Sequence, residues 1–201
     1  MKALLLRLSL LLLVLGMALP AHAEDEARQT IQQFSDSLLD VMTRASQLGF
    51  HGREELMRAA VLSAYDMPEM TKATLGPSAR KLTQQQLDQL TEAFTRYTAA
   101  IYAEQFDGYG GERFEVSAPR PSADGAVVVP CRIVSPSAPP TQIDYLMRQD
   151  QGHWRIVDVL LDGTVSQVAV RRSEFVTIYR RDGFPGLIEM LDHQTASMGS
   201  K

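Results

Sequence analysis

Apolar residues recur at helical spacing through the first half of the chain. Ile31, Phe34 and Leu38 follow one another three or four positions apart, which predicts an amphipathic helix over residues 25–47. Two glycines interrupt this pattern, and a shorter apolar stripe predicts a second helix around residues 56–61. The first part of the protein is therefore expected to be helical.

Two capping motifs mark where further helices begin. Asp66, with Glu69 three positions later, is typical of a helix N-cap, and Gly76 followed by proline predicts where that helix ends. Thr83 and Gln86 repeat the capping spacing ahead of a longer apolar stripe. We expect the helix that starts there to continue to the next glycine-rich segment of the chain.

The hydrophobic period changes in the middle of the chain. Four segments either alternate between apolar and polar residues or are apolar throughout: residues 113–118, 127–135, 143–148 and 154–161. Short turns between them indicate an antiparallel meander. The last segment is apolar in both alternating sets, so we expect it to be buried on both faces. Helices segregated from an antiparallel sheet define an α+β domain, here with a four-stranded twisted sheet packed against several helices.

These patterns divide the chain into three consecutive parts of one domain. Residues 24–107 are expected to be mostly helical, residues 111–161 to form the sheet, and residues 165–193 to form a helical tail that is broken at Gly183. The chain shows no internal repeat and no long linker. A single α+β domain over residues 24–201 is the simplest organisation, and its length allows a substantial core.

The first 23 residues have a different character. Lys2 and Arg7 precede an apolar run over residues 8–19, and a small-x-small sequence ends at Ala23. This order is typical of a secretory signal peptide, and the run is too short for a comfortable membrane span. We therefore expect residues 1–23 to be removed and the mature protein to act outside the cytoplasmic membrane.

Charge and cysteine content narrow the choice of partners. The chain has a formal net charge of −4, and loss of Lys2 and Arg7 makes it two units more negative. An acidic protein without a basic stripe is not expected to bind nucleic acid. Cys131 is the only cysteine, so no internal disulfide can form, and we expect this thiol to be buried in a strand. Nothing indicates a coiled coil, and we expect a monomer.

The sequence lacks the common catalytic and metal-binding motifs. It contains no G-x-S-x-G, no H-E-x-x-H and no P-loop, and His51, His153 and His193 lie far apart. We therefore expect no metal, no cofactor and no catalytic residue. One alternative is an isomerase-like or hydratase-like enzyme in which Asp158 is a general base and Tyr145 an oxyanion donor. The other reading of Asp158 is a structural carboxylate bonded to backbone groups or to an arginine.

The apolar faces of the predicted elements are rich in aromatic and flexible side chains. Such residues are typical of a cavity for a bulky apolar ligand, although they also serve simply to fill a core. If a cavity lies between the sheet and the helices, its candidate lining is Phe94, Tyr97, Ile101, Val129, Ile133, Tyr145, Met147, Trp154, Phe175 and Tyr179.

Several motifs in the second half of the chain are similar to those of a known family. They are Trp154-Arg155-Ile156-Val157-Asp158-Val159, Asp162-Gly163-Thr164-Val165-Ser166 and Arg172-Ser173-Glu174-Phe175. With the Asp-Met-x-x-Met stretch that begins at Asp66, they resemble the MlaC (toluene-tolerance) family of periplasmic lipid-binding proteins. The segments 106–114 and 171–175 look most like its hopanoid-biosynthesis-associated branch, HpnM.

This resemblance implies a fold and a role. Family members hold acyl chains in a cavity between a sheet and surrounding helices and serve ABC-type lipid transport systems. The implied function is a periplasmic carrier of a hopanoid or related lipid between the inner and outer membranes. Its implied partners are an inner-membrane and also an outer-membrane lipid transport complex. A phospholipid carrier of the same fold is one alternative, and a docking protein that uses the pairs Arg171-Arg172 and Arg180-Arg181 without binding lipid is another.

Overall fold

The computed structural model describes residues 20–200, with side chains from residue 25 onward. Most of the predicted signal peptide, residues 1–19, lies outside the described residues. The first described helix, α1 (Pro20–Thr43), begins before the predicted cleavage site. Among the described residues, no helix combines the length and the apolar character that crossing a bilayer requires.

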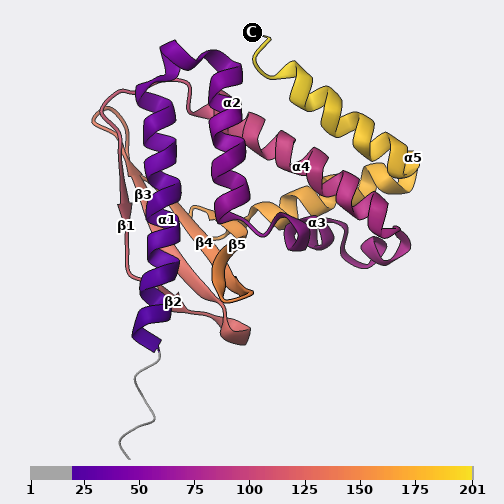
Figure 1. The fold of residues 1–201 in the computed structure, drawn as a ribbon, viewed down its shortest axis with the longest axis horizontal. Helices are drawn as coiled ribbons and strands as arrows, with labels where there is room; N and C mark the ends of the chain where they lie inside the picture. The colour runs from indigo at the N-terminus through magenta and orange to yellow at the C-terminus, as the bar shows by residue number, and fades with distance from the viewer. Residues whose placement is uncertain (1–19, 201) are drawn as a thin grey trace, which may run out of the picture.

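The described chain is a helical half, a sheet and a final helical segment, in that order (Figure 1). The helical half contains α1, α2 (Ala45–Ala64), α3 (Met67–Leu75), the 3-10 turn η1 (Gly76–Lys81) and α4 (Gln84–Gln105). The sheet contains β1 (Arg113–Val116), β2 (Arg120–Pro121), β3 (Val127–Val134), β4 (Thr141–Asp150), β5 (His153–Leu161) and β6 (Val165–Ser166), with the turn η2 (Ala123–Gly125) before β3. The final helical segment is α5 (Gln167–Ser197).

The sheet is antiparallel and has six strands, so the predicted number of four is wrong. The strand order is β1-β3-β4-β5-β6, and β2 also pairs with β3. The two extra strands, β2 and β6, are each two residues long. A two-residue segment is too short to show the alternation of apolar and polar residues that predicts a strand. These two segments are strands only because their backbones pair with a neighbouring strand. The predicted α+β class and the antiparallel meander are confirmed.

Local sequence signals fix the helix boundaries well. The Asp66 carboxylate accepts a hydrogen bond from the backbone N–H of Glu69 at 2.9 Å, as the N-cap prediction requires. Thr83 and Gln86 form the predicted reciprocal capping box, with distances of 3.2 and 2.9 Å. The first predicted helix is too long at its C-terminus, because α1 ends at Thr43.

Two glycines break the long helical segments. Gly49 in α2 has φ 60°, and Gly183 in α5 has φ 71°, values that favour glycine. The break predicted at Gly183 is therefore confirmed. The second predicted helix, residues 56–61, is part of a longer helical stretch that reaches Ala64.

The helices cover one face of the sheet. In Figure 1, α1 runs in front of the strands with α2 beside it, and α3, α4 and α5 extend beyond the sheet on one side. The strands point Val129, Cys131, Tyr145 and Met147 toward α1, and all four are buried. Burial raises the pKa of the Cys131 thiol to about 11, which keeps it protonated and supports an inert core role.

β5 carries a bulge that changes which side chains are buried. Its pairing with β4 shifts by one residue next to Leu146 and Met147. As a result, Ile156 and Val159 are both buried although they are three positions apart. Leu161 at the end of the strand is 38 % exposed, so the prediction that β5 is buried on both faces is wrong there.

Candidate functional site

An apolar pocket lies where α4, the first turn of α5 and the strands β4 and β5 meet. Its volume is about 160 Å³, and it opens to the surface. Most of its wall is aromatic or aliphatic, and its opening carries polar groups. The lining residues are Tyr65, Met70, Phe94, Thr98, Ile101, Tyr102, Gln105, Phe106, Ile143, Tyr145, Val159, Leu161, Gln167, Val168 and Arg171.

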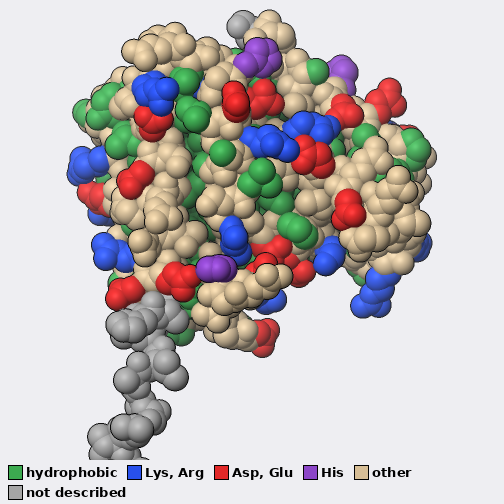
Figure 2. All heavy atoms as spheres, in the orientation of Figure 1, with side chains coloured by type: hydrophobic (Ala, Val, Ile, Leu, Met, Phe, Trp, Pro, Cys, Tyr) green, Lys and Arg blue, Asp and Glu red, His purple; other side chains and the backbone are tan. Residues whose placement is uncertain are grey.

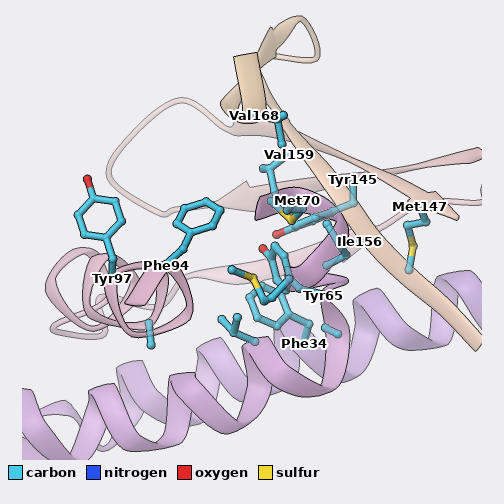
Figure 3. Packing of buried hydrophobic residues seen from close by; sticks show 14 of the residues in the cluster. Phe34, Tyr65, Met70, Phe94, Tyr97, Tyr145, Met147, Ile156, Val159 and Val168 are labelled. Carbon is cyan, nitrogen blue, oxygen red and sulfur yellow. The ribbon is translucent and has the colours of Figure 1, made fainter. Parts of the chain in front are cut away.

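Three tyrosines and a phenylalanine form the aromatic part of the pocket wall and its support. The hydroxyl oxygens of Tyr65 and Tyr102 are 2.5 Å apart and share a hydrogen bond. The Phe34 ring contacts both of their rings edge-on, each with a centroid distance of 5.3 Å, and the Tyr145 ring at 6.2 Å. Figure 3 shows Tyr145 reaching from β4 toward Tyr65 and Met70. The wall is thus built from elements far apart in the sequence.

These tyrosines stay protonated at any ordinary pH. Burial raises the pKa of Tyr102 to about 12. Burial also raises the pKa of Tyr65 and of Tyr145 well above the usual tyrosine range. Their hydroxyl groups are therefore hydrogen-bond donors to any ligand in the pocket.

The opening of the pocket is polar and includes one arginine. The Arg171 guanidinium donates to Glu174 at 3.0 Å and lies 5.0 Å from the centre of the Tyr97 ring. Its side chain is 23 % exposed. Gln105 and Gln167 contribute amide groups to the same opening. An apolar interior with a polar, cationic opening suits an amphipathic ligand.

Asp158 serves as a structural carboxylate at the corner between β5 and α5. It accepts hydrogen bonds from the backbone N–H groups of Val159 and Val168, at 2.8 and 3.0 Å. It also accepts from the Ser166 hydroxyl at 2.5 Å, and Ser166 itself caps α5. Asp158 does not line the pocket with Tyr145. This arrangement supports the structural reading of Asp158 over the general-base reading.

Exposed aliphatic side chains flank the opening. Leu161 lines the pocket and pairs across the strands with Val165, which is 47 % exposed. Leu161 and Val165 therefore border the opening on its β-strand side, and we call this exposed pair the apolar rim.

Comparison with known proteins identifies the family. A sequence model of the MlaC protein matches residues 32–193. The chain belongs to the MlaC family. A search of curated proteins returns no match. Among solved structures, a phospholipid-binding protein from Ralstonia solanacearum, determined in complex with a phospholipid, has a similar fold. The TM-score is 0.75 at 19 % identity, and the match covers 87 % of this chain and 99 % of the other.

The pocket between α4, α5 and the sheet includes only some of the candidate lining residues. Phe94, Ile101 and Tyr145 line it. Phe175 packs behind Phe94, with ring centroids 5.3 Å apart, and is fully buried. Tyr97 lies beside the opening, under Arg171. These residues therefore gather around one end of the domain.

The other candidates lie elsewhere. Val129 and Met147 are fully buried in the sheet core, and Ile133 is a half-buried residue of β3 paired with Phe114. Tyr179 lines a separate hollow on the surface beside Arg180.

Trp154 lines a second pocket, and its indole N–H has no hydrogen-bond acceptor among the described residues. This pocket, between α1, the end of α2 and β5, has a volume of about 340 Å³. Among the described side-chain nitrogen and oxygen atoms that are fully shielded from solvent and from any pocket, the Trp154 indole nitrogen alone lacks a hydrogen-bond partner.

Sequence reasoning missed several pocket residues. Tyr65 reaches the pocket because it forms an isolated parallel bridge with Ile156, and the backbone N–H of Asp66 donates to the Ile156 carbonyl at 2.9 Å. No pattern in the sequence around Tyr65 predicts this contact with Ile156. Tyr102 lies on the predicted stripe of α4, next to Ile101, and periodicity could have identified it.

The arginine pairs are largely occupied within the protein. Arg171 binds Glu174, and Arg172 donates to the Ala73 carbonyl at 2.7 Å, which ties α5 to α3. Arg181 pairs with Asp182 at 2.6 Å. On the face shown in Figure 2, basic and acidic side chains are interspersed rather than gathered by sign. The part of the chain that the structure describes holds no cluster of three or more potential metal ligands.

Proposed function

We propose that this protein is a lipid carrier that binds its cargo in the pocket between α4, α5 and the sheet. The observation that carries the proposal is the pocket itself, which joins an apolar aromatic wall to a polar opening with Arg171. Acyl or ring carbons would occupy the apolar interior, and the polar group would lie at the opening. The MlaC family assignment and the fold shared with a phospholipid-binding protein support this function.

Lipid binding in this pocket requires the wall to open further. The volume of about 160 Å³ is below the roughly 300–1,000 Å³ of typical ligand sites. The boundary between α4 and the start of α5 is the most suitable place for expansion. The half-buried side chain of Ile101 lines the pocket there and can move without opening the main core.

The physical need for such a carrier follows from the hydrophobic effect. Each CH₂ group moved from water into an apolar site contributes roughly 0.8 kcal/mol, so a long-chain lipid leaves a membrane slowly unless its chains stay covered. The apolar rim of Leu161 and Val165 suits a protein that meets an apolar surface during transfer. We propose that it shuttles lipid in the periplasm between inner-membrane and outer-membrane transport complexes, as a monomer.

Two cargo classes are candidates for this pocket. The motif segments 106–114 and 171–175 favour a hopanoid, whereas the name of the structural neighbour favours a phospholipid. Arg171 at the opening adds weight to a lipid with an anionic headgroup. Catalysis has less support, because both oxygens of Asp158 already bind structural partners.

Lipid extraction from the purified protein tests the function directly. The chain from Glu24 is expressed in a host that makes hopanoids, purified without detergent and analysed by mass spectrometry of an organic extract. A stoichiometric hopanoid or phospholipid supports the carrier and identifies the class. A folded protein that contains no lipid and takes none up from vesicles contradicts the carrier and leaves the docking role.

A further inference from the structure

The pocket contains hydroxyl donors for which the protein supplies no acceptor. Tyr145 is 1 % exposed, and its hydroxyl makes no hydrogen bond to any other described residue. Tyr65 and Tyr102 share one hydrogen bond, which uses only one of their two O–H groups. The other O–H has no acceptor among the described residues either. Two O–H donors on one pocket wall, that of Tyr145 and one from the Tyr65–Tyr102 pair, therefore lack an acceptor in the described part of the chain.

Three buried threonine hydroxyls are satisfied by nearby carbonyls. Thr71 and Thr74 donate to backbone carbonyls of their own helix, each at 2.8 Å. Thr95 does the same at 2.7 Å. The buried Ser35 hydroxyl has a weaker partner, the Cys131 sulfur at 4.0 Å. The tyrosine hydroxyls differ from all four because they face a pocket that a ligand can enter.

An unfilled donor in apolar surroundings is costly, and a phenylalanine at the same place would avoid that cost. Met70, Phe94, Ile143 and Val159 supply no strong acceptor. The side-chain oxygens of Thr98, Gln105 and Gln167 also line the pocket but accept no hydrogen bond from these tyrosines, which leaves the acceptor to come from what enters the pocket. A purely hydrocarbon ligand would leave both donors unpaired. A ligand with an oxygen among its carbons would satisfy them.

We propose that the Tyr65, Tyr102 and Tyr145 hydroxyls form a binding subsite for an acceptor oxygen carried on the apolar body of the lipid. This subsite rests on the carrier function proposed above and adds a chemical selection to it. The oxygen is an ester carbonyl in a diacyl lipid or a hydroxyl in a ring-containing lipid. Lipids without such an oxygen bind less well, even when their size and shape are the same.

Matched lipids test the subsite. Binding is measured for a diester phospholipid and for its dialkyl ether analogue with the same chains and headgroup, since ether oxygens are weaker acceptors. A second pair is a triterpenoid alcohol and its parent hydrocarbon. The wild-type protein should prefer the oxygen-bearing member of at least one pair by about 2- to 12-fold. The pair that shows the preference identifies the source of the oxygen.

Tyr145→Phe is the decisive variant, because it keeps the ring and removes the hydroxyl. The preference should disappear in this variant. Tyr109→Phe serves as the matched control, since Tyr109 is 51 % exposed and lies outside the pocket, and it should keep the wild-type preference. Melting curves of all three proteins verify that each is folded.

The possible failures are distinguishable. If the wild-type protein binds both members of each pair equally, or if Tyr145→Phe keeps the preference, the subsite is wrong while the carrier function stands; pocket water then fills the donors. If folded wild-type protein binds none of the four lipids, the subsite and the carrier function are both overturned.

Discussion

Arg171 both contacts side chains of α4 and α5 and borders the opening of the pocket. Its guanidinium is held by Glu174 and by the face of the Tyr97 ring, yet it still borders the pocket opening. An arginine fixed in this way loses little conformational freedom when it binds an anionic group. In the proposed carrier function, this side chain would contact an anionic headgroup without being free to collapse into the pocket.

We expect Arg171→Gln to weaken binding of an anionic phospholipid about fivefold. A partly exposed charge pair is worth about 1 kcal/mol, and the glutamine retains much of the side-chain packing. Lipid titration followed by fluorescence measures the effect. Arg181→Gln is the control, because Arg181 pairs with Asp182 outside this pocket. Equal losses in the two variants would mean that general surface charge, rather than the opening, attracts the lipid.

The buried tyrosines make stability depend on alkaline pH. The pKa of Tyr102 is raised to about 12, whereas in the unfolded chain it is about 10. Between these values the unfolded state has lost the proton and the folded state retains it, so the free energy of unfolding falls as pH rises. Urea denaturation at pH 9 and pH 11 should reveal this fall. Tyr102→Phe should reduce the fall, and an unchanged difference would contradict the assigned cause.

At the scale of elements, the corner between β5 and α5 depends on Asp158. One carboxylate holds two backbone N–H groups and the hydroxyl of the α5 N-cap residue, Ser166. This corner sets the direction of α5 and so positions Val168 and Arg171 in the pocket wall. The motif that resembles the MlaC family at this point is therefore explained by structure.

Asp158→Asn should destabilise the protein without abolishing lipid uptake. The amide can replace only part of the acceptor capacity, and loss of a helix cap typically costs about 0.5–2 kcal/mol. Thermal denaturation, together with lipid content by mass spectrometry, separates the two effects. Asp162→Asn is the matched control, because Asp162 is exposed with φ 50°, a conformation that asparagine tolerates. Loss of uptake in a well-folded Asp158→Asn protein would instead favour an active role.

Elements that depend on local interactions could be predicted from the sequence. The caps at Asp66 and Thr83 join groups three residues apart, and the break at Gly183 follows from one residue. By contrast, β2 and β6 exist only because β3 and β5 pair with them. The bulge in β5 has no signal in the sequence, and it decides that Val159 joins the buried side chains.

The site was harder to predict than the fold, because it forms where the two halves of the domain meet. Periodicity identified the apolar faces, and Phe94, Ile101 and Tyr145 do line the pocket. Periodicity cannot distinguish these residues from a plain core residue such as Met147, which has the same alternation. Tyr65 enters the pocket through tertiary contact alone.

At the scale of the whole molecule, two regions on the same face of the sheet differ in how they are covered. The helices α1 and α2 cover one region and bury the main core, so that region can stay rigid. The pocket lies at the edge of this core, where α4 and the start of α5 close it. A carrier needs this separation, because its cargo space must open while the rest of the fold remains intact.

A larger side chain on the pocket wall tests whether this pocket holds the lipid. Ile101 is half-buried on α4 and lines the pocket, so the larger side chain of Ile101→Trp should occupy space that lipid would use. We expect a several-fold loss of co-purified lipid, with a melting temperature close to that of the wild type because the pocket absorbs the added volume. Ile178→Trp is the control, since Ile178 is also half-buried but lies on α5 outside this pocket. Lipid content that is unchanged in folded Ile101→Trp would place the cargo elsewhere, and the pocket beside Trp154 would then be the next site to block.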